Sequence, residues 1–135
     1  MALRDYSEDD DYYVQGFEHK GVASVWVGVA DRALEIGTDT LQDLCGVGYY
    51  RLSDQESDMR GNALVEVSEL LSGISYAATF SAAVLEAAES KQVAKARRIV
   101  VQFDFAYVPE RVVRFVSEDP VFLGVFPYGT DEQPF

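Results

Sequence analysis

The run from Arg98 to Val108 constrains the fold of this chain more than any other stretch of the sequence. Its bulky apolar residues alternate with small or polar ones, with Val100 as a minor exception. Successive side chains of a strand point to opposite faces, so this alternation predicts a half-buried antiparallel strand. A second apolar run, Val121–Phe126, follows shortly after and is expected to pair with it. The residues expected on the apolar face are Ile99, Val101, Phe103, Phe105 and Tyr107.

Other segments carry weaker signals of regular structure. Gly21–Ala30 is apolar on both parities, which predicts a central strand, and Gly28 within it indicates a bulge or a close approach of the backbone. Apolar residues spaced by three and four predict helices over Ala63–Ser72 and from Tyr76 to about Glu89, the first capped by Asn62.

The stretch between the first strand and these helices is less regular. A short helix capped by Thr38 or Thr40 is expected near Leu41, followed by a short strand over Tyr49–Leu52 and a polar loop over Ser53–Asn62. The order of strand, helices and further strands predicts a single α+β domain, in which helices cover one face of a mostly antiparallel sheet. We expect an acidic, partly mobile arm over residues 1–20, the domain over residues 21–128 and a loose tail over residues 129–135.

The charge of the chain limits its partners. The 135 residues carry a formal net charge of −12, which disfavours direct binding to nucleic acid or to an anionic membrane surface and favours a basic partner. Acidity that serves only solubility is the alternative. Cys45 is the single cysteine, so the chain has no internal disulfide and no CxxC motif, which fits a reducing cytoplasm. No signal peptide or membrane-spanning run is expected from these residues.

Sequence motifs give no positive indication of catalysis. The chain has one histidine, His19, and one cysteine, and neither lies in a nucleophile motif; phosphate-loop, HExxH and dinucleotide patterns are also missing. We therefore expect no enzyme activity and no cofactor. Asp104 lies between two phenylalanines in the main strand, where it is either a partner contact or general base, or a structural residue paired with an arginine such as Arg114. The structural interpretation is favoured.

Acidic residues gather between the first strand and the helices, beside two tyrosines. A calcium loop is not expected there, because Asp54, Glu56 and Asp58 lack the glycine and distal glutamate of that motif. A solvated acidic face is one interpretation, and a surface that imitates nucleic-acid phosphates, with tyrosines as anchors, is the other. The candidate partner-binding residues are Asp31, Glu35, Asp39, Asp43, Tyr49, Tyr50, Asp54, Glu56 and Asp58.

Four segments, taken in order, resemble the bacterial immunity proteins grouped as immunity protein family twenty-two. The similarity spans about residues 22–128 and departs most between Asp31 and Gly61. The four segments are Val25–Gly28, Glu69–Tyr76, Val100–Tyr107 and Phe122–Tyr128.

This resemblance implies a function. Such proteins bind the toxin domain of a contact-dependent inhibition or other polymorphic toxin system in the bacterial cytoplasm and block it without turnover. Many of these toxins are nucleases with basic clefts, which suits an acidic inhibitor. Two other hypotheses stay open: a small acid–base or metal-dependent enzyme that uses the Asp/Glu clusters, and a scaffold subunit that dimerises through a sheet edge. The resemblance does not supply the candidate binding residues, which come from composition.

Overall fold

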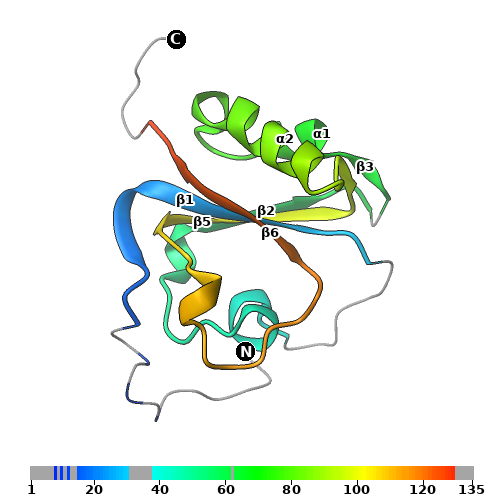
Figure 1. The fold of residues 1–135 in the computed structure, drawn as a ribbon. Coiled ribbons are helices and arrows are strands. Elements are labelled where there is room, and N and C mark those ends of the chain that lie inside the picture. The colour runs from blue at the N-terminus through cyan, green and yellow to red at the C-terminus, as the bar shows by residue number, and fades with distance from the viewer. Residues whose placement is uncertain are drawn as a thin grey trace.

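The computed structural model describes Glu8, Asp10, Tyr12 and residues 15–30, 38–61 and 63–129. In these residues the fold is a mostly antiparallel sheet with helices on one face, as the sequence predicts (Figure 1). The strands are β1 Glu18–Gly28, β2 Gln55–Met59, β3 Val65–Glu66, β4 Lys95–Ala96, β5 Arg98–Phe105 and β6 Val121–Pro127. The helices are α1 Val67–Leu71 and α2 Ser81–Ser90, and the short helical turns are η1 Thr40–Leu44, η2 Leu52–Asp54, η3 Ala77–Thr79 and η4 Pro109–Arg111.

The main sheet has the strand order β2-β5-β1-β6, with all neighbours antiparallel. β1 is therefore central, as its two apolar faces predict. The prediction that the last strand pairs with the main strand is wrong, because β6 pairs with β1 and β1 separates it from β5. β3 and β4 form a separate two-stranded sheet.

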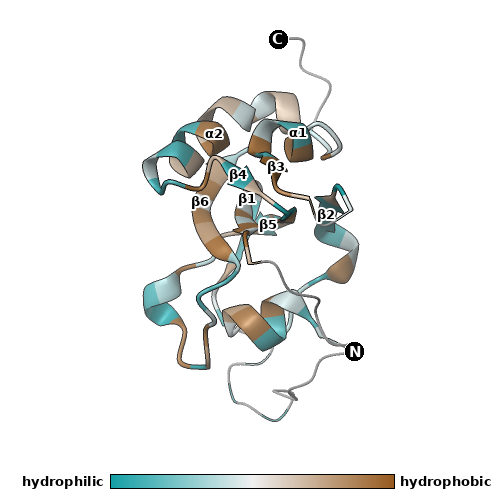
Figure 2. Ribbon diagram, turned by 90° about the vertical axis from the view of Figure 1, so that its right-hand side faces the viewer, coloured by the Kyte–Doolittle hydropathy of each residue, from teal (hydrophilic) through white to brown (hydrophobic). Residues whose placement is uncertain are grey.

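The helix-side face of the sheet carries an aliphatic core. Val25 and Val27 of β1 pack there with Val84 of α2 and Leu70 of α1, and all four are fully buried. Figure 2 shows both helices over this face of the sheet, with hydrophobic and hydrophilic residues following one another along each helix. The stripe of α2 expected from its spacing, with Phe80, Val84 and Ala88, is the one that the sheet buries.

The opposite face is covered by coil with short helical turns, and its core is aromatic. Trp26 of β1 packs there against Tyr107 and Phe122, with ring centroids 5.1 and 5.3 Å away. Phe17, which precedes β1, joins the same cluster at 3% exposure. The sheet is thus buried on both sides by layers of different kinds (Figure 1).

The odd-numbered apolar residues of the main strand do not all lie on one face of the sheet. Ile99, Val101 and Phe103 face the helices, whereas Phe105 and Tyr107 lie in the aromatic core on the other side. The cause is Asp104, whose φ of 57° interrupts the extended backbone, so that the β1–β5 register shifts at this point. Assigning Phe105 and Tyr107 to the first face is therefore wrong.

Several expected boundaries also move. The strand expected over Tyr49–Leu52 is absent from the described residues there, and β2 lies instead within the stretch expected to be a loop. Part of the helix expected over Ala63–Ser72 is the short strand β3, and only Val67–Leu71 is helical. Asn62, its expected cap, lies outside the described residues.

Two further helices differ from expectation at their starts. α2 starts at Ser81, because Tyr76 has a left-handed φ of 59° and the turn η3 follows it. The short helix near Leu41 is capped by Asp39, whose side chain accepts a hydrogen bond from Gln42 N, rather than by a threonine.

Gly28 provides room for a neighbouring side chain. A Cβ at this position would lie 2.4 Å from Nε of Arg98, so the glycine allows the arginine side chain to cross the backbone here. Arg98 is then held by Asp119 in an ion pair of 2.7 Å.

Candidate functional site

Two residues with left-handed backbone meet at one end of the sheet. Asp104 ends the regular part of β5 and Tyr76 precedes η3, with φ values of 57° and 59°. Aspartate tolerates this region better than most residues, whereas a tyrosine there carries backbone strain. Such strain persists where the surrounding structure imposes it, and it is concentrated at functional sites. Both residues line the same pocket, of about 350 Å³.

Asp104 is held in this pocket by two hydrogen bonds to the same oxygen. Oδ1 accepts from the backbone N–H of Gly21 at 2.9 Å and from the hydroxyl of Tyr128 at 2.6 Å. Arg114, the partner considered from the sequence, instead donates to the carbonyl of Gly46. The structural role expected for Asp104 thus involves a tyrosine and an amide.

The pKa of Asp104 lies below its ordinary value. Partial burial on its own raises this pKa, but the hydrogen bonds from Tyr128 and Gly21 and the positive charges of Lys20 and Arg51 outweigh it. The side chain is therefore a carboxylate throughout the neutral range. The pKa of Tyr128 is raised by its own burial and by its bond to Asp104, so this hydroxyl keeps its proton.

Aromatic rings form one wall of the pocket. The ring of Tyr128 lies 4.8 Å from that of Phe103 and 5.4 Å from that of Tyr76, measured between centroids. Tyr76 is 45% exposed and Phe103 is buried below it. Rings that are fixed from below and open above provide rigid contact area at low entropic cost.

Carboxylates from the edge of the sheet also line the pocket. Asp54 ends η2 and Glu56 lies in β2, and both line the pocket with Asp104. Glu56 accepts a hydrogen bond from Ser75 N at 2.8 Å, which ties β2 to the segment that carries Tyr76. Within the described part of the chain, Lys20 is the one basic residue that lines the pocket. We call this arrangement the acidic pocket; its residues are Lys20, Ser53, Asp54, Glu56, Tyr76, Phe103, Asp104 and Tyr128.

The acidic pocket can hold a cation. Three carboxylates and two phenol rings surround a space of side-chain size, and both kinds of group attract positive charge. In the described residues, no three His, Cys, Asp or Glu side chains are placed to hold a metal ion. An organic cation such as the side chain of lysine or arginine fits the mixture of carboxylates and rings.

Of the nine residues predicted from composition, the structure brings Asp54 and Glu56 into this pocket. Asp58 lies in the same strand but binds Arg60, at 2.6 Å. Tyr49 lies elsewhere, with its ring at an edge-on distance of 6.1 Å from that of Tyr12. Asp31 and Glu35 lie outside the described residues.

Three of the predicted residues instead hold the coil layer together. Asp39 accepts hydrogen bonds from Gln42 N at 3.0 Å and from the hydroxyl of Tyr50 at 2.6 Å. Asp43 is fully buried and accepts from Asp39 N at 2.7 Å. A buried carboxylate with this role is closed to a partner, so Asp43 is removed from the candidate surface, and Asp39 and Tyr50 serve the fold.

Little in the sequence indicates the aromatic half of the site. In the sequence Tyr76 lies at the start of an expected helix, and in the structure Tyr128 directly follows β6. Neither position has a pattern that points to a pocket. Asp104 did carry a signal, because an acid between two phenylalanines in a strand is unusual.

Cys45 lies outside this pocket and is buried. Its burial, and to a smaller extent the negative charges of Asp39 and Asp119, raise the pKa of its thiol.

None of the helices in the described residues is long and apolar enough to cross a membrane. No protein-family model, curated protein or solved structure matches this chain.

Proposed function

We propose that this protein is an immunity protein, which binds a basic toxin domain in the bacterial cytoplasm and occludes its active-site surface without chemical turnover. The observation that carries this proposal is the acidic pocket on a chain with a net charge of −12. A nuclease toxin has lysine and arginine side chains in its cleft, where they bind phosphates. An inhibitor that presents carboxylates in a fixed geometry competes for those cations.

Contact is made by a lysine or arginine of the toxin that enters the acidic pocket. Its charge lies between the carboxylates of Asp54 and Glu56, and its aliphatic stem or guanidinium plane lies against Tyr76. Asp104 contributes a permanent negative charge, since its pKa is lowered. Close charge pairs at protein interfaces couple by about 1.5–7 kcal/mol, which is enough to dominate the affinity.

The long-range part of the recognition is electrostatic. A net charge of −12 steers a basic partner toward the protein, so the association rate falls as salt is added. The partner is the C-terminal toxin domain encoded beside this protein, probed as a catalytically inactive variant.

The test is calorimetric titration of that domain with wild-type protein, Asp54→Lys and Glu110→Lys. Both variants change the net charge equally, but Glu110 is exposed on η4, on the coil-covered side. We expect Asp54→Lys to weaken binding about 100-fold and Glu110→Lys less than about three-fold. The proposal fails if no complex forms at about micromolar concentration, or if the two variants weaken binding equally.

The second candidate is an acid–base enzyme, favoured by the convergence of three carboxylates in one pocket. The lowered pKa of Asp104 makes it a poor proton donor at neutral pH, so its role there would be electrostatic stabilisation of a cationic intermediate. Turnover of a substrate that Asp104→Asn abolishes, without loss of folding, would favour this candidate over the inhibitor.

A further inference from the structure

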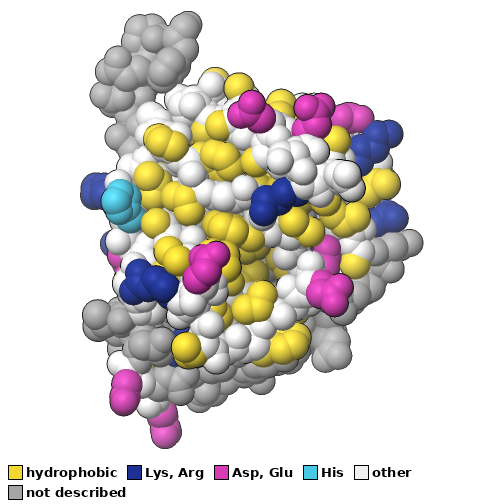
Figure 3. All heavy atoms as spheres, in the orientation of Figure 1, with side chains coloured by type: hydrophobic (Ala, Val, Ile, Leu, Met, Phe, Trp, Pro, Cys, Tyr) yellow, Lys and Arg dark blue, Asp and Glu magenta, His cyan; other side chains and the backbone are white. Residues whose placement is uncertain are grey.

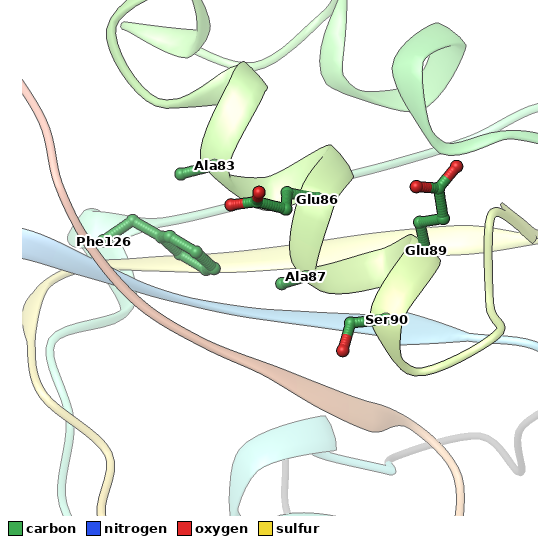
Figure 4. Close-up of a pocket in the computed structure, with 6 residues that line it drawn as sticks. All are labelled: Ala83, Glu86, Ala87, Glu89, Ser90 and Phe126. Carbon is green, nitrogen blue, oxygen red and sulfur yellow. The ribbon is translucent and has the colours of Figure 1, made fainter.

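A second surface lies at the other edge of the sheet, away from β2. α2 runs over β6, and an open groove of about 700 Å³ lies between them. Its floor and walls are formed by the small side chains Ala83, Ala87 and Ser90 of α2 and by the ring of Phe126 of β6 (Figure 4). Glu86 extends over the groove toward Phe126, and Glu89 lies at its rim.

The strand beside this groove has an unpaired edge. β6 is the last strand of the sheet, and its inner edge pairs with β1. Tyr128 N donates to Gly21 O at 3.1 Å, while Pro127 lies opposite Val22 and Val125 opposite Ser24. Opposed residues alternate between bonded and non-bonded pairs in an antiparallel ladder, so Val125 directs its N–H and C=O outward. Pro127 lies at the next outward position, where the missing N–H costs no ladder bond.

The face around this edge is apolar. Figure 3 shows hydrophobic side chains gathered across the middle of the face, where β6 crosses it, interrupted by one basic side chain near the centre, with acidic side chains above them on the side of α2. Val125 is 36% exposed, although it lies in the middle of a strand. A strand edge, an apolar groove and an acidic rim together form the features that recognise an extended peptide.

We propose that the groove between α2 and the outer edge of β6 binds an extended segment of a partner protein that alternates apolar residues with lysine or arginine. The segment adds as a strand to β6 and exchanges hydrogen bonds with the main chain of Val125. One apolar side chain enters the groove above Phe126, and a neighbouring cation binds Glu86. This surface is separate from the acidic pocket, and its test does not depend on the proposed function.

Charge decides between a basic partner and a second copy of the chain. Within the described residues, Glu86 and Glu89 form no ion pair, so both are available to a basic segment. A symmetric dimer through β6 would bring two such edges together, each on a chain of net charge −12. Like charges at a shared edge oppose that association.

The expected affinity for a short peptide is modest. The irregularity in the β1–β6 register between Val25 and Trp26 shortens the regular edge to which the peptide can add.

The experiment is an NMR titration of the ¹⁵N-labelled protein with the capped peptide KVKVKVK. We expect saturable shifts at the amides of Val125, Ala83 and Ala87, slower hydrogen exchange at Val125, and a dissociation constant on the order of 1 mM or tighter. The peptide EVEVEVE tests the charge requirement, and replacement of the central valine by proline tests main-chain pairing. Each change is expected to weaken binding about ten-fold or more.

Matched protein variants locate the cation contact. Glu86→Lys with Glu89→Lys should weaken binding of KVKVKVK about ten-fold, whereas Glu18→Lys with Glu110→Lys, exposed elsewhere, should change it less than about three-fold. The proposal is overturned if the shifts lie in the acidic pocket instead, or if the proline peptide binds as well as the original. Light scattering that shows a dimer with Val125 at its interface would overturn the choice of a basic segment.

Discussion

The two faces of the sheet are buried by opposite strategies. On the helix side, aliphatic residues such as Val25, Leu70 and Val84 pack beneath α1 and α2. A helix of the length of α2 satisfies most of its own backbone hydrogen bonds, so the packing beneath it requires little more than apolar shape. On the coil side, the covering chain has no such internal pairing, and side chains supply the missing partners.

These side-chain bonds are numerous and specific on the coil side. Ser24 donates to the carbonyl of Phe105 at 2.7 Å and accepts from Tyr107 N at 2.9 Å. The hydroxyl of Tyr107 donates to the carbonyl of Cys45 at 2.6 Å. Gln15 donates to the carbonyl of Tyr49 and accepts from Gly48 N. Polar residues at single positions therefore specify the irregular layer, whereas a repeating apolar pattern specifies the helical layer.

The largest effect is expected from removing the centre of the aromatic cluster. Trp26 is 1% exposed and contacts the rings of Tyr107 and Phe122, so Trp26→Ala should lower the free energy of unfolding by about 3–5 kcal/mol. Urea unfolding followed by circular dichroism measures it, with Leu70→Ala, expected at about 2–5 kcal/mol, as the helix-side reference. An unchanged melting temperature for Trp26→Ala would contradict the burial described here.

The next effect concerns the ion pair that ties the coil layer to the sheet. Asp119 binds Arg98 at 2.7 Å, with side chains only 14% and 12% exposed, and its other oxygen accepts from Val29 N at 2.7 Å and Ala30 N at 3.2 Å. Asp119→Ala should cost about 3 kcal/mol, because it leaves a largely buried guanidinium and two amides without their acceptor.

A double variant distinguishes the cost of the unpaired Arg98 charge from the cost of the two unbonded amides. Adding Arg98→Met to Asp119→Ala removes the uncompensated cation, so the double variant should be more stable than Asp119→Ala alone. Equal stabilities in urea unfolding would show that the cost comes from the two backbone amides alone.

A smaller effect tests one hydroxyl of the coil layer. Tyr107→Phe leaves the buried carbonyl of Cys45 without its donor, which should cost about 1–2 kcal/mol. The thiol of Cys45 is buried with a raised pKa, so it reacts with a thiol reagent mainly when this layer opens. Labelling should therefore be faster in Tyr107→Phe than in Val84→Ala, even at matched global stability. Equal labelling rates would mean that the two faces open together.

The same contrast explains how far the sequence predicts the fold. Regular spacing of apolar residues identified β5 and the buried stripe of α2, whereas a continuous apolar run identified the central strand β1. β2 was missed because Gln55–Met59 is an edge strand with largely polar residues, and its pairing with β5 leaves no such period. The coil layer was missed because single polar residues specify it, and these leave no repeating pattern in the sequence.

The candidate site is predicted from the sequence only in part. Asp54 and Glu56 were predicted from the abundance of acids, but the pocket depends on two left-handed residues, Asp104 and Tyr76. No periodicity reveals a single reversed φ in a non-glycine residue. At Asp104 the apolar side chains of β5 also change sides: Phe103 lies in the aliphatic core and Phe105 in the aromatic core. The candidate site therefore lies where the two cores meet.

The smallest expected effect concerns the charge of Asp104, the residue at this boundary. Asp104→Asn keeps the size of the side chain and its tolerance of left-handed backbone, so it removes mainly the ionised group. The pKa of Asp104 in the folded state lies below its unfolded value of about 3.9, so the folded state favours the carboxylate. The stabilisation is then complete above the unfolded pKa and is lost as the pH falls through the folded pKa.

Wild type should therefore exceed Asp104→Asn in the free energy of unfolding by on the order of 1 kcal/mol at neutral pH, because asparagine accepts the bonds from Gly21 and Tyr128 more weakly. This difference should shrink below about pH 4, where the unfolded carboxyl takes up its proton. Denaturant unfolding of both proteins from neutral to acid pH measures it. A difference that grows toward acid pH would reverse the sign of the pKa shift and remove the permanent charge on which cation binding in the acidic pocket depends.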